Sequence, residues 1–231
     1  MIKIDKTNVV GWEAAIRGMR NPMNSWDKSD SGLRLMNEND VEFGYEPNYE
    51  YIIGKDDIKL MLSLAKAGHS HSKYRRMINV TCDITAPLYW WKEYDTYKVG
   101  TVANSTSTMH KITSKRIELS DFSIDDFGEM SSGSEGIGLS LIDFFCNVVA
   151  DCEFLREQYI ATKDKRYWKG LIQLLPTSYN QLRTVQFNYE VLANMYHDRK
   201  NHKLDEWREL CNWIRSLPYS EIITEEQEHE K

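Results

Sequence analysis

The sequence predicts a single α+β domain over residues 1–231, with a mixed part at about 1–130 and a helical part at about 139–220. Short strand-like segments lie in the first part, and long amphipathic helix patterns fill the second. No internal repeat is visible, and the composition is ordinary for a soluble globular protein. A chain of 231 residues can bury a sizeable core.

Helix and strand signals alternate through the first part of the chain. WEAAIRGMRNP predicts a short helix that Pro22 stops, and YEYIIG at 49–54 predicts a short strand. DDIKLMLSLAKAG begins with an acidic pair and ends at Gly68, so it predicts a helix with start and stop signals. MINVTCDIT alternates apolar and polar residues, which is typical of a half-buried strand. The aromatic segment after Pro87 fits either a helix or a strand.

The second part begins with MSSGSEGIG at 130–138, which predicts a loop. LSLIDFFCNVVADCEFLREQYIATKD then predicts one long amphipathic helix. A second long helix is predicted to begin after Pro176 and to run through VQFNYEVLANMYHDRK. A third covers LDEWRELCNWIRSL and ends at Pro218, and the tail EEQEHEK is expected to fray.

Composition excludes several classes of function. The net charge of −6 argues against a protein that coats nucleic acid, because duplex binding needs a concentrated basic surface. Four cysteines without a CxxC pair indicate neither a zinc site nor a disulfide framework, so we expect no metal. No apolar run approaches the length of a membrane span, and the N-terminus lacks a signal-peptide core. We therefore expect a cytoplasmic protein without a membrane partner.

Two kinds of stretch suggest a polar or anionic ligand. VANSTSTMHK at 102–111 is rich in hydroxyl side chains, which fits either a surface loop or a lining that presents hydroxyls and amides to a ligand. The cluster KYRR at 73–76 and the pair Arg199 and Lys200 could supply the two or three cations that a phosphate needs. Solvated surface charge is the alternative for both clusters.

A polar stripe follows Asn188. If the helix is continuous, steps of three or four residues place apolar side chains at both ends of one face and polar ones in its middle. This face comprises Asn188, Leu192, Met195, Arg199, His202, Glu206, Leu210 and Trp213. A buried guanidinium is costly unless paired, so Arg199 should meet a carboxylate, a ligand phosphate or solvent. An ion pair with Glu206 or an aspartate is the purely structural alternative.

Two blocks of the sequence resemble the flavin-dependent thymidylate synthases, the ThyX family. GHSHSKYRRMINVTCDITAPLYWWKEYDTYKVGTVANSTSTMHK is similar to the central block, with its Gly-His start, strand, Ala-Pro, aromatic helix and R-H-R-x7-S signature. LPTSYNQLRTVQFNYEVLANMYHDRKNHKLDEW is similar to the C-terminal block. Its matching positions are Leu175, Pro176, Asn188, Asn194 and Arg199. The two blocks cover about a third of the chain.

The resemblance implies a mixed or antiparallel sheet with long helices, and a homotetramer that holds FAD at its subunit interfaces. It implies a one-carbon transferase of nucleotide biosynthesis. Such an enzyme moves a carbon from methylenetetrahydrofolate to C5 of a pyrimidine deoxynucleotide, by default from dUMP to dTMP, and NADPH reduces the flavin. In such a reaction the flavin carries the chemistry, while the protein binds, orients and polarises the pyrimidine.

The resemblance also implies the site residues. The cofactor-binding residues are His71, Tyr97, Lys98, Asn188, Asn194 and His202. The nucleotide-binding residues are Asn104, Ser105, Ser107 and Arg199. Ser107 closes the signature and is assigned the catalytic position, where its role is to position the nucleotide. For Ser107 a helix cap is the structural alternative, and for the two helix asparagines an ordinary polar position.

Several family positions are altered. The R-H-R signature falls within residues 96–99, where Lys98 is its one remaining cation. Met109 replaces the arginine two residues after the serine, Glu190 replaces a helix arginine, and Ser105 replaces an acidic residue. The candidate substitute cations are Arg75, Arg76, His110, Lys111 and His202. These changes leave two other functions open, a divergent pyrimidine nucleotide C5-hydroxymethylase and a non-catalytic nucleotide-binding homologue.

Overall fold

The computed structural model describes residues 2–36, 49–128, 130–131 and 140–225. The chain divides into two compact units. The first unit comprises Met1–Asp5, Asp83–Thr96 and Ala103–Thr184. The second unit comprises Lys6–Cys82, Tyr97–Val102 and Val185–Lys231. Helices and strands occur in both, so the predicted α+β class is confirmed, while the single domain stays a prediction.

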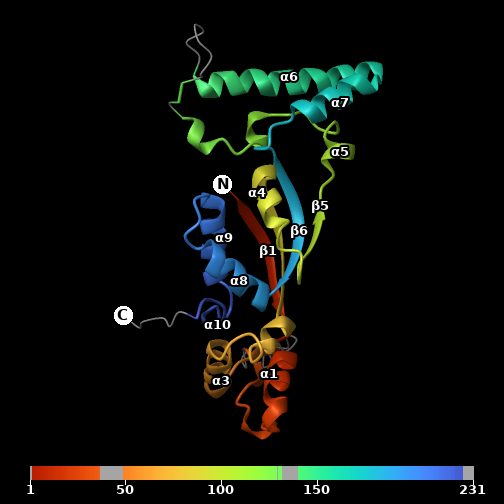
Figure 1. Cartoon of the computed structure of the whole chain (residues 1–231). Coiled ribbons are helices and arrows are strands. Elements are labelled where there is room, and N and C mark those ends of the chain that lie inside the picture. The colour runs from red at the N-terminus through yellow and green to blue at the C-terminus, as the bar shows by residue number, and fades with distance from the viewer. Residues whose placement is uncertain (1, 37–48, 129, 132–139, 226–231) are drawn as a thin grey trace. The chain divides into compact units, whose positions relative to one another are not determined.

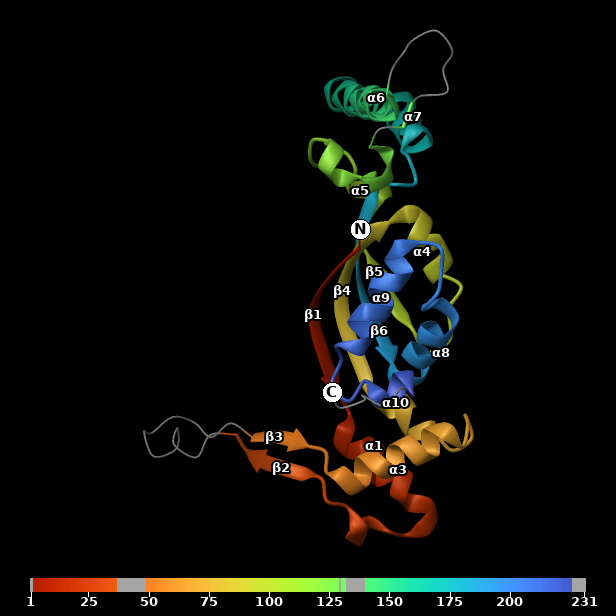
Figure 2. The same ribbon diagram turned by 90° about the vertical axis from the view of Figure 1, so that its left-hand side faces the viewer.

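Four strands form one sheet of order β1-β4-β6-β5. They are β1 (Lys3–Val10), β4 (Asn79–Pro87), β5 (Val102–Ser105) and β6 (Asn180–Asn188). In β4 every second residue is buried, because one face of the strand packs on the core, and the predicted half-buried strand is confirmed. A separate antiparallel ribbon joins β2 (Gly32–Leu35) to β3 (Tyr49–Ile52), which confirms the predicted strand there (Figure 2).

In the second unit, the two helices predicted near the N-terminus are confirmed as α1 (Trp12–Arg20) and α3 (Lys55–Lys66). A buried ion pair links them. Arg20 Nε lies 2.7 Å from Asp57 Oδ1, and the two side chains are 5% and 0% exposed. The hydroxyls of Ser29 and Ser31 each donate to Asp57 Oδ2 at 2.6 Å, so this carboxylate is fully satisfied.

The second unit also contains the short 3₁₀ helices η1 (Asn21–Met23), η2 (Trp26–Lys28) and η3 (Lys73–Met77).

The prediction of a long helix after Pro176 is wrong for the first half of that segment. Residues 180–188 form β6, whose inward side chains include Val185 and Phe187, and the helix begins only at Tyr189. Asn188 marks the change of structure, because its side chain accepts a hydrogen bond from the Val191 backbone N–H at 3.0 Å and caps the helix.

The polar stripe is not one continuous helix face either. The helix α8 (Tyr189–Arg199) is separated by five residues from α9 (Asp205–Arg215), and α10 (Glu221–Thr224) follows. The predicted helix over LDEWRELCNWIRSL is confirmed as α9. Arg199 is therefore the last residue of a helix, where its side chain can turn towards the next one.

In the first unit, the aromatic segment after Pro87 is the helix α4 (Leu88–Tyr94), with Trp90, Trp91 and Tyr94 buried. The predicted long helix is confirmed as α6 (Leu141–Thr162), and α7 (Lys165–Leu174) packs along it (Figure 1). The remaining elements are α5 (Thr108–Lys111), η4 (Leu119–Asp121) and η5 (Asp125–Phe127). Most of the predicted loop at 130–138 and of the tail lies outside the described residues.

No helix among the described residues is long and apolar enough to cross a membrane.

Candidate functional site

The segment VANSTSTMHK is a strand followed by a capped turn. Residues 102–105 form the exposed strand β5, and Ser107 caps α5 by accepting a hydrogen bond from the His110 backbone N–H at 3.1 Å. Buried Gln181 holds the connection between them, because its amide donates to the Thr106 carbonyl at 2.7 Å. The Thr106 N–H in turn donates to the Leu182 carbonyl at 2.9 Å. These bonds fix the backbone that carries Ser107.

Ser107 lines a polar cavity of about 360 Å³ within the first unit. Seven of its described lining residues carry hydroxyl groups, namely Thr85, Thr106, Ser107, Thr108, Ser114, Ser120 and Tyr179. Two lysines, Lys111 and Lys115, also line it. The segment is thus an exposed strand that leads into a turn lining a cavity, and the presentation of its hydroxyls and amides to a ligand stays a prediction.

The two lysines differ in their surroundings. Lys115 pairs with Asp121, and the hydrogen bond to that carboxylate raises the pKa of the Lys115 ammonium. Lys111 makes no ion pair with another residue in the part of the chain that the structure describes. A phosphate in this cavity would therefore meet one uncompensated ammonium, one shared ammonium and several hydroxyl donors.

A second group of candidate residues surrounds Arg199 within the second unit. Arg199 Nε donates to the Tyr97 hydroxyl at 2.9 Å, and this hydroxyl donates to Asp198 at 3.3 Å. The guanidinium carbon lies 4.6 Å from the centre of the buried Trp207 ring, a distance suited to a cation–π contact. The break between α8 and α9 makes this possible, because Trp207 lies on α9. Burial raises the pKa of Tyr97, which keeps the phenol protonated.

Glu190 lies in a third cluster, also in the second unit. This buried carboxylate contacts His69 Nδ1 at 2.6 Å, and guanidinium nitrogens of Arg75 and Arg76 at 3.8 and 4.0 Å. Arg75 also pairs with Glu225 at 3.0 Å. Arg75 and Arg76, two of the candidate substitute cations, are therefore already compensated by carboxylates.

Comparison with known proteins identifies the architecture. No family model and no curated protein matches the sequence. Thymidylate synthase X (ThyX) from Helicobacter pylori, solved with FAD and dUMP, is 14% identical, with a TM-score of 0.64 over 96% of both chains. A UMP/dUMP methylase, PolB from Streptomyces cacaoi, solved with 5-Br dUMP, is 14% identical, with a TM-score of 0.59 over 97% of this chain and 95% of that one. The chain has the ThyX fold.

The ThyX fold confirms the resemblance seen in the two sequence blocks at the level of architecture. The candidate residues divide between the two units. Asn104, Ser105 and Ser107 belong to the first unit, and His71, Tyr97, Lys98, Asn188, Asn194, Arg199 and His202 to the second. The assignment of these residues to flavin or nucleotide stays a prediction.

The residues assigned to the flavin in this ThyX fold differ in accessibility. His71, Lys98 and Asn194 are exposed, so their imidazole, ammonium and amide groups are accessible to a ligand. Asn188 is half-buried and uses its oxygen as the cap of α8. His202 packs edge-on against Trp207 with ring centres 6.2 Å apart. The same Trp207 ring also contacts the guanidinium of Arg199.

Sequence reasoning missed the partners of these residues. Trp207 and Tyr97 hold Arg199, and Lys115 shares the cavity of Ser107, yet the sequence pattern alone did not indicate any of these roles. A signal existed for Glu190, because a lone acidic residue in the mostly apolar run YEVLANM needs a partner if it is buried. Among the described residues, no group of three or more His, Cys, Asp or Glu side chains could hold a metal ion.

Proposed function

We propose that this chain is a flavin-dependent transferase that moves a one-carbon unit from methylenetetrahydrofolate to C5 of a pyrimidine deoxynucleotide, with dUMP as the first candidate. The observation that carries the proposal is that Ser107 lines a hydroxyl-rich cavity together with two lysines. The ThyX fold supports it, because similar structures were solved with dUMP or 5-Br dUMP. A homotetramer located in the cytoplasm belongs to the same proposal.

Ser107 acts in this proposal by positioning the nucleotide. Its oxygen already accepts the His110 N–H, and its own hydrogen remains to be donated to a phosphate or a pyrimidine carbonyl. Lys111 and Lys115 neutralise the phosphate, replacing the missing arginine at Met109. Asn104 and Ser105, exposed on β5, offer an amide and a hydroxyl that can stabilise charge as it develops on the ring.

Arg199 is the second nucleotide-binding group. The Tyr97 hydroxyl and the Trp207 face hold its guanidinium in one plane, which lowers the conformational entropy lost when a ligand binds. A planar fork suits a phosphate or a pyrimidine edge. Tyr97 therefore positions Arg199 in this chain, in place of a charged signature residue.

The accessible side chains of the second unit offer the kinds of polar and charged groups that FAD needs. His71 and Asn194 offer hydrogen-bond donors to the ring system, and Lys98 offers a cation to the diphosphate. Arg75 fits less well, because two carboxylates already share its charge. When bound, FAD supplies the hydride and carbon-carrying chemistry, with NADPH as its reductant.

The altered charges favour one second candidate function. Glu190, Met109 and Tyr97 stand where the resemblance expects cations, so the pyrimidine accepted or the group transferred can differ from the default. C5-hydroxymethylation of a pyrimidine monophosphate is this second candidate. A nucleotide-binding homologue without catalysis would retain the cavity of Ser107 and bind no flavin.

The visible spectrum of the purified protein tests the proposal. We expect flavin absorption, either as isolated or after addition of FAD. Incubation with methylenetetrahydrofolate, NADPH and either dUMP or dCMP should then yield a product with a methyl group at C5, and a hydroxymethyl product would select the second candidate. A colourless protein that takes up no added FAD would contradict both enzymatic functions.

Replacing Lys111 with alanine should weaken dUMP binding about tenfold, because a charge-assisted hydrogen bond to the phosphate is lost. Binding of deoxyuridine, which lacks the phosphate, should stay unchanged in the same titration calorimetry. Lys169→Ala, an exposed lysine on α7, is the matched control. Equal losses for dUMP and deoxyuridine would show that Lys111 does not contact the phosphate.

A further inference from the structure

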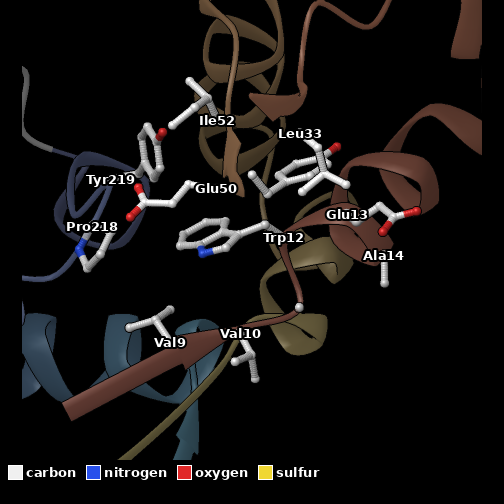
Figure 3. A pocket seen from close by; sticks show the side chains of 12 residues that line it. Val9, Val10, Trp12, Glu13, Ala14, Leu33, Glu50, Ile52, Pro218 and Tyr219 are labelled. Carbon is white, nitrogen blue, oxygen red and sulfur yellow. The ribbon is translucent and has the colours of Figure 1, made fainter. Parts of the chain in front are cut away.

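A second cavity, of about 770 Å³, lies within the second unit, and none of the residues assigned to flavin or nucleotide lines it (Figure 3). The end of β1, the first turn of α1, the β2–β3 ribbon and the segment Pro218–Tyr219 form its walls. Its volume falls in the range of small-molecule sites. The cavity is therefore large enough for a ligand that the proposed transfer reaction does not use.

Aromatic rings form one wall of this cavity. Trp12, Tyr51 and Tyr219 line it. Trp12 stands edge-on to Tyr189 and to Tyr219, with ring centres 5.2 Å apart in both pairs. The Tyr219 hydroxyl accepts the Ile53 backbone N–H at 3.2 Å, which ties this ring to the end of the ribbon. The rings thus form a supported surface whose faces and edges are fixed before any ligand binds.

Tyr219 has a backbone conformation that bulky residues seldom adopt. Its φ is 54°, in the left-handed region, where a side chain with a Cβ is disfavoured. Strain of this kind persists only where the surrounding structure compensates for it, and it is concentrated at functional sites. The neighbouring Pro218 carbonyl accepts a hydrogen bond from the Tyr189 hydroxyl at 2.6 Å, which helps to hold the turn.

The charge in this cavity is negative. Glu13 and Glu50 line it, and no lysine, arginine or histidine is among its described lining residues. Glu13 lies 3.7 Å from Arg17, and it also offsets the positive end of the α1 dipole. Glu50 lies opposite Arg34 in the β2–β3 ladder, but its carboxylate makes no ion pair or hydrogen bond with another described residue. Figure 3 shows its carboxylate near Tyr219 and Trp12.

We propose that this cavity binds a small organic cation, an ammonium or guanidinium group carried on an apolar body. The cation lies against the Glu50 carboxylate and the face of an aromatic ring, the arrangement that recognises ammonium groups elsewhere. The apolar body packs on Val9, Val10 and Ile52. An anion would meet two carboxylates, and a neutral ligand would desolvate Glu50 without compensation.

A matched pair of ligands tests this site. Phenethylamine and phenethyl alcohol have nearly the same shape, but only the amine carries a positive charge. Binding is followed by the NMR signal of the Trp12 indole N–H, which is identified by its absence from the spectrum of Trp12→Phe. We expect the amine to shift this signal and to bind about tenfold more tightly than the alcohol.

Variants assign the preference to Glu50. Glu50→Gln should reduce the preference for the amine to about twofold, and because Glu50 is exposed the fold should be unaffected. Glu157→Gln, an exposed carboxylate on α6, should leave the preference unchanged. Equal affinity for the two ligands would overturn the proposal. So would an unchanged preference for the amine in Glu50→Gln, or binding of the amine that leaves the Trp12 indole N–H signal unshifted. The experiment uses no nucleotide or flavin, so its outcome is independent of the proposed transfer reaction.

Discussion

Replacing Arg199 with alanine is expected to weaken dUMP binding by about tenfold to hundredfold, because charge-assisted hydrogen bonds to a nucleotide are worth about 1.5–3 kcal/mol. The guanidinium is held by Tyr97 and Trp207 before any ligand arrives, so the variant also loses a preorganised group. Equilibrium binding measures the affinity, and tritium release from labelled dUMP measures turnover.

Tyr97→Phe separates the role of the arginine from the role of its support. The ring remains against Trp207 while the hydroxyl that accepts Arg199 Nε is lost, so we expect a loss of only about threefold. Arg166→Ala removes an exposed arginine on α7 and should bind dUMP normally. If Arg199→Ala releases tritium at the wild-type rate, the proposed role of Arg199 in nucleotide binding is excluded.

Replacing Asp57 with alanine is expected to lower the free energy of unfolding by about 3–5 kcal/mol, because the buried guanidinium of Arg20 then has no carboxylate partner. The hydroxyls of Ser29 and Ser31 lose their acceptor as well. Urea denaturation measures the change from the shift in midpoint at constant slope.

Asp56→Ala is the matched control for this prediction. Asp56 precedes Asp57 on the same helix, but its carboxylate is exposed and, among the described residues, forms an ion pair only with exposed Lys59, at 3.4 Å, so we expect a loss below about 1 kcal/mol. The double variant Arg20→Met, Asp57→Leu should regain part of the loss, because no buried charge remains unpaired. Similar midpoints for the two single variants would show that the buried pair contributes little.

Elements with a local signal could be predicted from the sequence, and others could not. The alternation in MINVTCDIT predicts β4, and the acidic start and Gly68 stop predict α3. β6 was missed because QLRTVQFN runs without a break into a helical pattern, and tertiary pairing with other strands decides its conformation. Asn188, a favourable capping residue, was a local signal of the boundary that the periodicity obscured.

The candidate site shows the same division between local and long-range information. Ser107 and Lys111 are one helical turn apart, so their proximity follows from the sequence once a turn is assumed. Tyr97 and Arg199 lie 102 residues apart, and only the folded chain brings them together. Glu190 and Arg75 are even farther apart in sequence, so the loss of Arg75 as a substitute cation could not be foreseen.

The Glu190 cluster bears on how fast an anionic ligand finds this protein. KYRR is the most concentrated basic run in the sequence, but Glu190 and Glu225 cancel the charges of Arg75 and Arg76 at close range. Of the three cations in this run, only exposed Lys73 has no carboxylate partner among the described residues, so the patch keeps about one positive charge and a correspondingly weak potential. Long-range steering of a nucleotide must therefore rely mainly on cations outside this run, and added salt should slow association mainly through them.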